Sequence, residues 1–401
     1  MLRSLFSGIS GLRAHQTMLD VTGNNIANVN TAGYKAAQVQ FQDTLSQVLS
    51  NAGAAQPGIG GTNPAQVGLG VKVAGITTNF QQGAAQLTNR QTDMMISGDG
   101  FFVINKGGQQ LYSRAGAFSF DALGQLVTPD GGLVQGWAAD ASGNIDLNSL
   151  LTDLRLPVST LMGARASTTA SFEGNLPFDA AEDTVLNRQI DVYDATGEPR
   201  SMEVSFTRTA AGWDIAAAVT GTTSSQTGSL TFNTDGSINA LTFAAMPADA
   251  AAGLAAITVD FATLTGFAGL ETVAANSQNG RSAGSLQSFA INSDGTLIGS
   301  FSNGLKQAIG RVALANFSNP PGLSKVGSSL FEPTVNSGDA QVGAAGTGGR
   351  GVLSGGSLEM SNVDLSAEFT NLIVAQRGFQ ANSRVITTSD EVLQELVNLK
   401  R

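Results

Sequence analysis

The residue types that carry most enzyme chemistry are scarce in this chain. Its 401 residues include no cysteine and a single histidine, His15. The lack of cysteine excludes disulfides and thiolate nucleophiles, and one histidine leaves almost no zinc chemistry. His15 lies between Ala14 and Gln16 in a helical pattern, and no motif around it could complete a catalytic triad. We therefore interpret His15 as a packing or solvent-facing side chain.

Two further patterns could hold a ligand, and each has a simpler interpretation. Residues 58–70 read GIGGTNPAQVGLG but lack the preceding strand, the following helix and the acidic residue of a dinucleotide-binding loop. Asp or Asn followed three residues later by Gly recurs without the carboxylate ladder and distant Glu of a calcium loop. This spacing predicts β-turns, so we expect no catalytic residue, cofactor or metal site. These turns begin at Asp121, Asp140, Asp194, Asn233 and Asn292.

Net charge and hydropathy limit the classes of partner. Lys and Arg number 21 and Asp and Glu number 31, so the net charge is 21 − 31 = −10 and no basic face is available for nucleic acid. The amino terminus, MLRSLFSGISGLRAHQ, lacks the apolar core of a signal peptide, and no stretch of about 18 apolar residues could insert in a membrane. If the protein is exported, we expect a route other than general secretion.

The elements that could position a functional surface lie at the two ends of the chain. Near the amino terminus, apolar residues repeat every seven positions and predict a helix of about 26 residues. The companion row of this heptad pattern becomes polar and small at Gln16 and Gly23. The apolar positions of both rows are Leu2, Leu5, Ile9, Leu12, Leu19 and Ile26.

The carboxyl end repeats the same pattern. Ser361, with Asp364 three residues later, predicts a capping box that opens a helix of about 37 residues. Its companion row is polar in the middle, at Gln376, Ser383 and Asp390. The apolar row consists of Leu365, Leu372, Phe379, Ile386 and Leu393.

We predict a multidomain fold, with coiled-coil-like amino- and carboxyl-terminal α-helices paired together and nested mainly-β domains. Two segments rich in Gly, Ala, Asn and Ser, the first containing Pro57 and Pro64, are typical of linkers. Recurrent turns between them predict β structure, and a shift toward Ala and Thr indicates an inserted domain. The predicted domains are 1–30 with 358–401 (helical), 31–70 with 336–357 (linkers), 71–144 with 285–335 (β-rich inner body) and 145–284 (β-rich outer domain).

Residues 19–35, LDVTGNNIANVNTAGYK, resemble the amino-terminal signature of the bacterial flagellar rod, hook and hook-associated proteins. Three later segments resemble other signatures of this family and occur in the same order. About 145–284 matches no such motif. The three segments are SGDGFFVI (97–104), YSRAGAFSFDALGQLVTPDG (112–131) and GSLEMSNVDLSAEFTNLIVAQRGFQANSRVITTSDEVLQELVNLK (356–400).

The resemblance implies a structural subunit and not an enzyme. The length and the large insert are similar to those of hook subunits, which assemble with themselves into a flexible tube, a universal joint that transmits torque from motor and rod to filament. Such a subunit passes through the type III export apparatus without a cleaved signal peptide, so the implied location is the extracellular flagellum. The implied partners are further copies of the chain, the rod, the hook-cap and the hook–filament junction proteins, with no nucleic acid and no membrane insertion.

Two alternative functions stay open. In the family that this chain resembles, a distal rod subunit shares the signatures but is much shorter in the middle of its sequence. The choice between a rod and a hook subunit therefore depends on whether residues 145–284 fold as a separate outer domain. An unrelated β-rich adhesin would lack heptads at both termini.

In this family the terminal helices form the inner tube, which implies that their rows face other subunits. Asn offers donors and acceptors, so the Asn run would both end the first helix and bind neighbouring subunits. A plain helix stop would need only one Gly or Asn. The predicted interface residues are Leu5, Ile9, Leu12, Leu19, Asn24, Asn25, Ile26, Asn28, Leu365, Leu372, Gln376, Phe379, Ile386 and Leu393.

Phe41 and Leu45 resemble the short Phe-x-x-x-apolar export signal of rod and hook subunits. Their spacing also suits an ordinary apolar contact between positions i and i+4, so both interpretations stay open.

Long helices with narrow apolar stripes are marginally stable alone, so we expect the ends to be unfolded in the free subunit. Trypsin should then cut near Arg13, Lys35, Arg377 and Arg384.

Overall fold

The described chain forms two compact units. The computed structural model describes residues 2–54, 60–156 and 162–399, so the proline at position 57 and both chain ends lie outside it, as does the side chain of Leu2. One unit is an insertion in the sequence of the other, and the second unit contains both chain ends. We call them the inserted unit, Pro157–Phe289 with Gly299–Gln307, and the terminal unit, Met1–Leu156 with Ala290–Ile298 and Ala308–Arg401.

The insertion begins after Leu156, whereas composition placed its start at residue 145. β12 (Thr152–Asp153) pairs with β11 (Leu133–Ala138), and the next residue, Leu154, is buried in a core of the terminal unit. This pairing holds residues 145–156 in the terminal unit. Composition missed it because a two-residue strand leaves no periodic signal.

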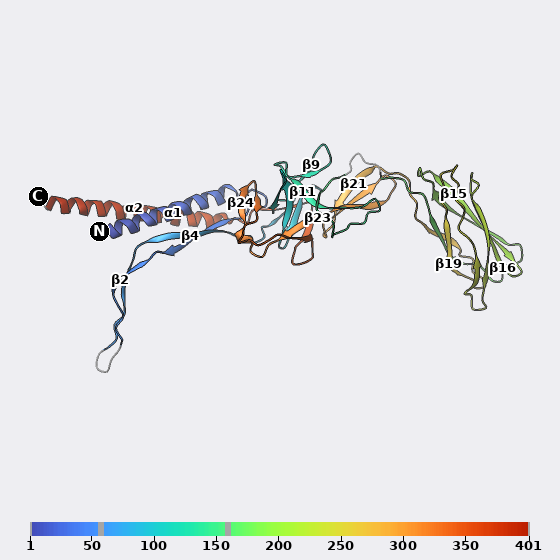
Figure 1. The fold of residues 1–401 in the computed structure, drawn as a ribbon, viewed down its shortest axis with the longest axis horizontal. Coiled ribbons are helices and arrows are strands. Elements are labelled where there is room, and N and C mark those ends of the chain that lie inside the picture. Colours follow the sequence, from blue (N-terminus) through green and yellow to red (C-terminus); the bar gives the residue numbers. More distant parts are fainter. Residues whose placement is uncertain (1, 55–59, 157–161, 400–401) are drawn as a thin grey trace. The chain divides into compact units, whose positions relative to one another are not determined.

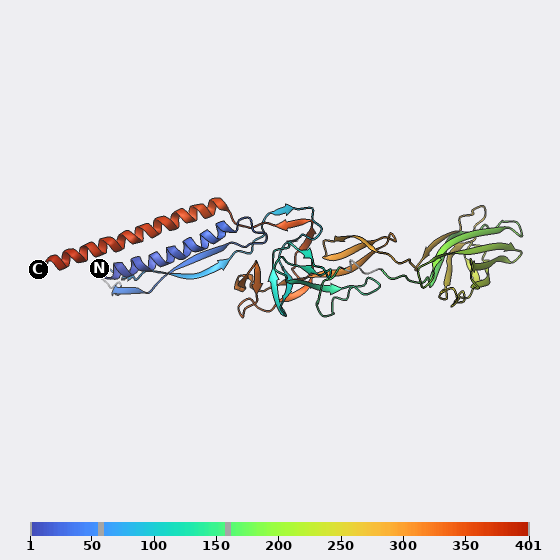
Figure 2. The same ribbon diagram turned by 90° about the horizontal axis from the view of Figure 1, so that it is seen from above.

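The terminal unit contains the predicted helices, α1 (Leu2–Ala27) and α2 (Leu365–Leu399), which lie side by side in both views (Figures 1 and 2). The helix lengths expected from the heptads are confirmed. The start of α2 differs in detail, because Asp364 and not Ser361 caps the helix. Asp364 Oδ1 accepts from the backbone N–H groups of Ser366 and Ala367 at 2.8 and 3.3 Å.

Small residues make the contact between the helices. A Cβ atom added at Gly11 would lie 2.6 Å from Asn382 Oδ1, and one added at Gly378 would lie 2.5 Å from the His15 ring. Since a real Cβ atom cannot approach so closely, the glycines let the two backbones come together. Coiled-coil packing of the leucine rows against each other stays a prediction.

The predicted linker 31–70 contains paired strands. β1 (Ala37–Asp43) pairs with β4 (Val71–Thr78), β2 (Ser46–Ser50) pairs with β3 (Ala65–Gly68), and Gly53 bridges Thr62. We call residues 37–78 the arm (Figure 1). Valine and phenylalanine favour β-strands, so these segments pair. The sequence predicts a linker because residues 50–70 are rich in glycine and alanine.

The second predicted linker, 336–357, is part of the folded body. β26 (Gln341–Ala344) pairs with β23 (Lys306–Asn316), and β27 (Val352–Gly355) pairs with β6 (Met94–Ser97). Many of its glycines have positive φ, so they form turns between short strands. The composition therefore reflects tight turns rather than a loose connection.

A long antiparallel sheet forms the body of the terminal unit. Its path is β21-β22-β23-β11-β7-β8-β25-β24, with β9, β10, β12 and β26 attached beside it. β28 (Ser357–Glu359) pairs separately with β5 (Ala85–Leu87). The strands not yet given are β7 (Phe101–Lys106), β8 (Gln109–Ser113), β9 (Ser119–Phe120), β10 (Leu126–Val127), β21 (Leu286–Ile291), β22 (Thr296–Phe301), β24 (Ser324–Gly327) and β25 (Leu330–Glu332), with a 3-10 turn at Pro320–Gly322.

β7 is buried on both faces because alternate residues point into different cores. Phe102 packs edge-on against Phe118, with ring centroids 5.1 Å apart, in a cluster that includes Val312 and Leu314. Phe101 packs against Phe317 in a second cluster. The strand FFVI is thus the centre of the body.

The inserted unit is a β-sandwich. One sheet has the order β14-β15-β16-β17-β18 and the other β19-β13-β20. Rings from both sheets meet in one core, where Phe206 lies 5.8 Å from Phe261 and 6.4 Å from Phe172. The strands are β13 (Thr169–Asn175), β14 (Val185–Tyr193), β15 (Pro199–Thr209), β16 (Gly212–Val219), β17 (Ser225–Phe232), β18 (Ile238–Thr242), β19 (Thr258–Thr265) and β20 (Ala274–Gln278).

Each of the predicted turns is confirmed. In all of them the Gly N–H donates to the carbonyl of the Asp or Asn three residues earlier, at 3.0 Å. The glycines have φ between +74° and +87°, the region that a side chain disfavours. They are Gly124, Gly143, Gly197, Gly236 and Gly295.

The turn at Asp194 is held by its carboxylate. Hydrogen bonds from the Thr196 hydroxyl, the Glu198 and Thr196 N–H groups and Arg200 lower the pKa of Asp194 to about 2. The folded pKa is below the ordinary value, so this stabilisation is present above about pH 4 and is lost as the pH falls toward 2.

A buried ion pair joins both chain ends to the body of the terminal unit. Lys35 Nζ lies 2.7 Å from Glu359 Oε1 and donates to the Gln81 carbonyl at 2.7 Å. Arg114 lies 3.6 Å from the other Glu359 oxygen. The Lys35 and Glu359 side chains are 0 % exposed. Lys35 is therefore inaccessible in the folded terminal unit, so tryptic cleavage there would require this node to open, and the cleavage stays a prediction for a free subunit with unfolded ends.

Burial lowers the pKa of Lys35, and its hydrogen bond to Glu359 opposes that shift. Glu359 also accepts from Gly83 N–H at 2.9 Å, and its carbonyl accepts from Gly33 N–H at 2.8 Å. One residue near the start of the carboxyl-terminal segment thus binds the segment that follows α1 and the segment that precedes β5. We call Glu359 and its partners the Glu359 node.

Replacing Lys35 by Met should lower the free energy of unfolding of the terminal unit by about 3–5 kcal/mol, because Glu359 keeps a buried charge without its closest partner. Urea unfolding followed by fluorescence measures this, since Trp137 lies in the terminal unit and a Trp213→Phe background removes the signal of the inserted unit.

The matched control is Lys106→Met, which breaks a half-exposed pair with Asp130 at 3.8 Å and should cost at most about 1 kcal/mol. Equal losses for the two variants would contradict the assigned role of the buried pair.

Candidate assembly surfaces

α2 leaves an apolar stripe uncovered. In the described part of the chain, five valines and leucines on one face of α2 are 41–82 % exposed, and Ala375 is the buried residue of the helix. Contiguous exposed apolar surface of this kind marks a contact site for another protein. The stripe consists of Val374, Val385, Val392, Leu396 and Leu399, and Phe369 and Ile373 are exposed on a neighbouring face.

The predicted apolar rows lie beside the contact between the helices. The face of α1 that is buried consists of small or polar residues, namely Gly8, Gly11, Ala14, Thr22 and Asn25. The predicted rows are therefore only partly covered within the chain, and their role between subunits stays a prediction. Half-buried are Leu5, Ile9, Leu12, Leu19, Ile26, Leu372, Ile386 and Leu393, and exposed are Leu365, Gln376 and Phe379.

Asn25 serves the fold of its own chain. Its Nδ2 donates to the Ala37 carbonyl at 2.8 Å and to Glu368 Oε1 at 3.0 Å. Its Oδ1 accepts from Ala37 N–H at 3.0 Å and from the Tyr34 hydroxyl at 3.1 Å. At 1 % exposure it makes all the hydrogen bonds that an amide side chain can make. It thus ties α1 to α2 and to the arm, and has none left for a neighbouring subunit.

Asn24 and Asn28 lie at the end of α1 and have a different environment. Asn28 Nδ2 donates to the Asn24 carbonyl at 2.9 Å, and Asn24 Nδ2 donates to the Tyr34 hydroxyl at 3.2 Å. Burial, and then the Glu368 carboxylate, raises the pKa of Tyr34. Asn24 is exposed and Asn28 half-buried, so both remain candidates for contact with another subunit.

The predicted export residues lie on and beside the arm. The Phe41 ring packs against the His15 ring with centroids 5.8 Å apart, whereas Leu45 is 83 % exposed. Phe41 therefore packs on α1, although it is itself 42 % exposed, and Leu45 is the more exposed of the two.

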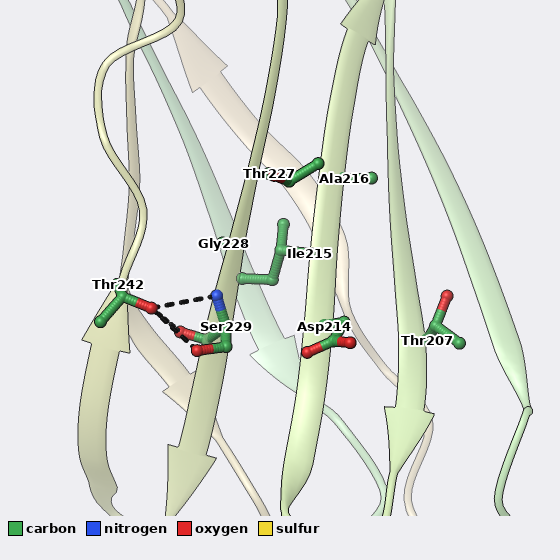
Figure 3. A pocket seen from close by; sticks show the side chains of 8 residues that line it. All are labelled: Thr207, Asp214, Ile215, Ala216, Thr227, Gly228, Ser229 and Thr242. Atoms are coloured by element: carbon green, nitrogen blue, oxygen red, sulfur yellow. Dashed lines mark hydrogen bonds between the residues drawn. The ribbon is translucent and has the colours of Figure 1, made fainter.

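A hollow of about 380 Å³ lies on one face of the inserted unit (Figure 3). Ser229 and Thr242 hydroxyls bond to each other across it at 2.8 Å, and Asp214 is the carboxylate among its lining residues. The hydroxyls are thus already paired, and one carboxylate forms no acid–base couple. The remaining lining residues are Thr207, Ile215, Ala216, Thr227 and Gly228.

Within 2–54, 60–156 and 162–399, no cluster of three or more His, Cys, Asp or Glu side chains is placed to hold a metal ion. Over the same residues, neither helix is both long and apolar enough for a membrane span.

Family models match this chain in four segments. These are "Flagella basal body rod protein" over 5–35, "Flagellar hook protein FlgE/F/G D1 domain" over 95–160, "Flagellar basal body protein FlaE D2 domain" over 163–281, and "Flagellar basal body rod FlgEFG protein C-terminal" over 354–399. The flagellar hook protein FlgE of Borreliella burgdorferi is 39 % identical, with all of both chains aligned. The chain belongs to the flagellar hook and rod protein family.

Other family members show the same relation. FlgE of Salmonella typhimurium is 37 % identical, with 99 % of this chain and all of that protein covered. The rod protein FlgG of Bacillus subtilis is 35 % identical, with full coverage of both. A crystal structure of Helicobacter pylori hook protein FlgE2 matches 69 % of this chain and all of that one with a TM-score of 0.56 at 14 % identity, a likeness of fold. The family is a structural one.

Sequence reasoning missed the Glu359 node. Lys35, Arg114 and Glu359 are separated by long stretches of sequence, and charged residues are usually exposed, so no local pattern marks them as buried. The one feature of the sequence that could have marked Lys35 and Glu359 is that both lie inside segments that resemble family signatures.

Replacing Asn25 by Ala should destabilise the packing of α1 by about 2–4 kcal/mol, because Ala37 N–H and carbonyl lose their partner in a buried place. Asn30→Ala is the control, since Asn30 is exposed in the same run. Urea unfolding of the subunit in the Trp213→Phe background compares the two, and equal stability of both variants would contradict the role given to Asn25.

Proposed function

We propose that the protein is a structural subunit of the flagellar hook that assembles with itself into a flexible tube and transmits torque as a universal joint. One observation carries this proposal: α2, formed by the carboxyl end of the chain and packed beside α1, keeps apolar side chains exposed along one face. In water such a stripe is stabilised when it is covered, at about 25 cal/mol per Å² of apolar surface. Another copy of the chain supplies a matching surface.

The alternative is a distal rod subunit, and the inserted unit is the part of the chain in which a difference between rod and hook was expected. The strands from β13 to β20, within residues 169–278, form a β-sandwich with its own core. Most of this unit matches the model described as a D2 domain, over 163–281. The insertion does not separate the two, because the rod protein FlgG of Bacillus subtilis also covers the whole chain. The hook proteins are the more similar relatives, at 39 % and 37 % identity against 35 % for that rod protein, which supports the hook subunit.

The remaining parts of the proposal follow from a hook role. The protein is extracellular in the flagellum, reaches it through the type III export apparatus without a cleaved signal peptide, and contacts the rod, hook-cap and hook–filament junction proteins. It catalyses no reaction and uses no cofactor. The paired helices assemble as a coiled-coil-like inner tube in which the predicted rows face other subunits.

Electron microscopy of assemblies purified from cells tests the proposal. A hook subunit gives short curved tubes, and deletion of the gene should leave basal bodies that end at the rod. Straight rods would favour the rod alternative, and a chain absent from the flagellum would contradict both.

We propose that Phe41 and Leu45 are part of an export signal, and the exposure of Leu45 allows a test that leaves packing intact. Leu45→Ala should cut secretion several-fold while leaving the subunit folded, because its side chain is exposed. Leu49→Ala is the matched control, being another exposed leucine of the arm. Immunoblots measure the amount of subunit in the culture medium relative to the amount in the cells. Normal secretion of Leu45→Ala would show that Leu45 is not part of the export signal.

A further inference from the structure

His15, the single histidine of the chain, lies where α1, α2 and the arm meet. A Cβ atom added at Gly378 of α2 would be 2.5–2.8 Å from three atoms of the His15 ring, so the ring lies directly on the α2 backbone. The ring centroid of Phe41, a residue of the arm, is 5.8 Å from that of His15. The imidazole is therefore a packed part of the contact between three elements.

One nitrogen of this ring is buried without a partner. Nδ1 is shielded from solvent, and within residues 2–54, 60–156 and 162–399 it makes no hydrogen bond. Gly378 offers no free acceptor, because its carbonyl accepts the Asn382 side-chain amide at 2.8 Å in addition to its helical hydrogen bond. A neutral imidazole carries one N–H and can leave Nδ1 unprotonated. A charged imidazole must place an N–H at the buried Nδ1 without an acceptor, which disfavours the charge in the packed contact.

The surroundings do not compensate a charge on His15. Among the described residues no carboxylate forms an ion pair with the ring. The charged residues closest to the contact along the three elements are all exposed, and three of the five are cations. They are Arg13 and Asp20 of α1, Arg377 of α2, and Asp43 and Lys72 of the arm. A proton on His15 would therefore add a charge that has no counter-charge in this contact.

We infer that His15 makes the contact between α1, α2 and the arm sensitive to acid, so that assembly weakens when this imidazole takes up a proton. Histidine is the side chain that ordinarily titrates between pH 5 and 8. The packed contact holds the neutral ring, whereas an unfolded chain end accepts the proton freely. The stabilisation is therefore present above about pH 6.5 and is lost as the pH falls below it. The inference rests on the proposed self-assembly and adds to it a control by pH.

The pH dependence of assembly tests this inference. If the tube holds His15 neutral and the free subunit does not, the subunit concentration needed for assembly should rise about tenfold between about pH 7.5 and about pH 5.5. His15→Gln should remove this rise, because carboxylates ordinarily titrate near pH 4, below this range. Sedimentation of tubes measures the concentration. An unchanged requirement in the parent, or the same rise in His15→Gln, would overturn the inference.

A histidine placed elsewhere is the matched control. In the His15→Gln background, Gln109→His returns one imidazole to the chain at the exposed start of β8. This variant should need the same subunit concentration at both pH values. A rise restored by Gln109→His would show that the packed position of His15 is not required, and would overturn the inference.

The charge of the ring can also be measured without a variant. Histidine labelled with ¹³C gives the signal of one imidazole, because the chain has one histidine. At about pH 5.5, solid-state NMR of the tubes should show a neutral ring, and solution NMR of the free subunit a charged one. A charged ring in the tubes would overturn the inference even if His15→Gln fails to assemble. Failure of the parent to form tubes at either pH would contradict the proposed function, and the inference with it.

Discussion

The buried Glu359 carboxylate is the constraint on which the terminal unit depends. It accepts from Lys35 and Gly83, faces Arg114, and its backbone carbonyl accepts from Gly33. Charges are stable in such a place only when they are paired and hydrogen-bonded. Because these partners come from the segment after α1, from the body and from the segment before α2, the charge is compensated only when all three are assembled. The node therefore specifies that both chain ends leave the body at one place.

The helices beyond this node are held in a different way. α1 and α2 meet through glycine, alanine and Asn25, and α2 keeps a stripe of valine and leucine exposed. Close backbone contact brings the helices together and leaves their apolar rows only partly covered, so the exposed part can be stabilised further when another protein covers it. These two features suit a subunit of a polymer. The Glu359 node holds the body-proximal ends of the helices, and the exposed side chains of α2 can pack against another subunit on assembly.

The sequence predicted features that local patterns encode. Heptads located α1 and α2, and Asp or Asn three residues before Gly located the turns, since both depend on residues close in the chain. Lys35 was interpreted as an accessible trypsin site because burial of a charge is decided by Glu359, which is far away in sequence. Asn25 was assigned to neighbouring subunits because its partners Ala37 and Glu368 meet only in the folded unit. The segment 336–357 was interpreted as a linker because glycine in tight turns has the same composition as glycine in a flexible chain.

Hydrogen exchange of free and assembled subunits tests the account most directly. The amides of Gly33 and Gly83 bond to Glu359, and the amides of α1 and α2 bond within the helices. If the node holds both chain ends and assembly stabilises the helices, Gly33 and Gly83 should exchange slowly in both states, while the helix amides distant from Asn25 exchange fast in the free subunit and slowly in the tube. Gly33 and Gly83 amides that exchange as fast as the helix amides in the free subunit would contradict the account.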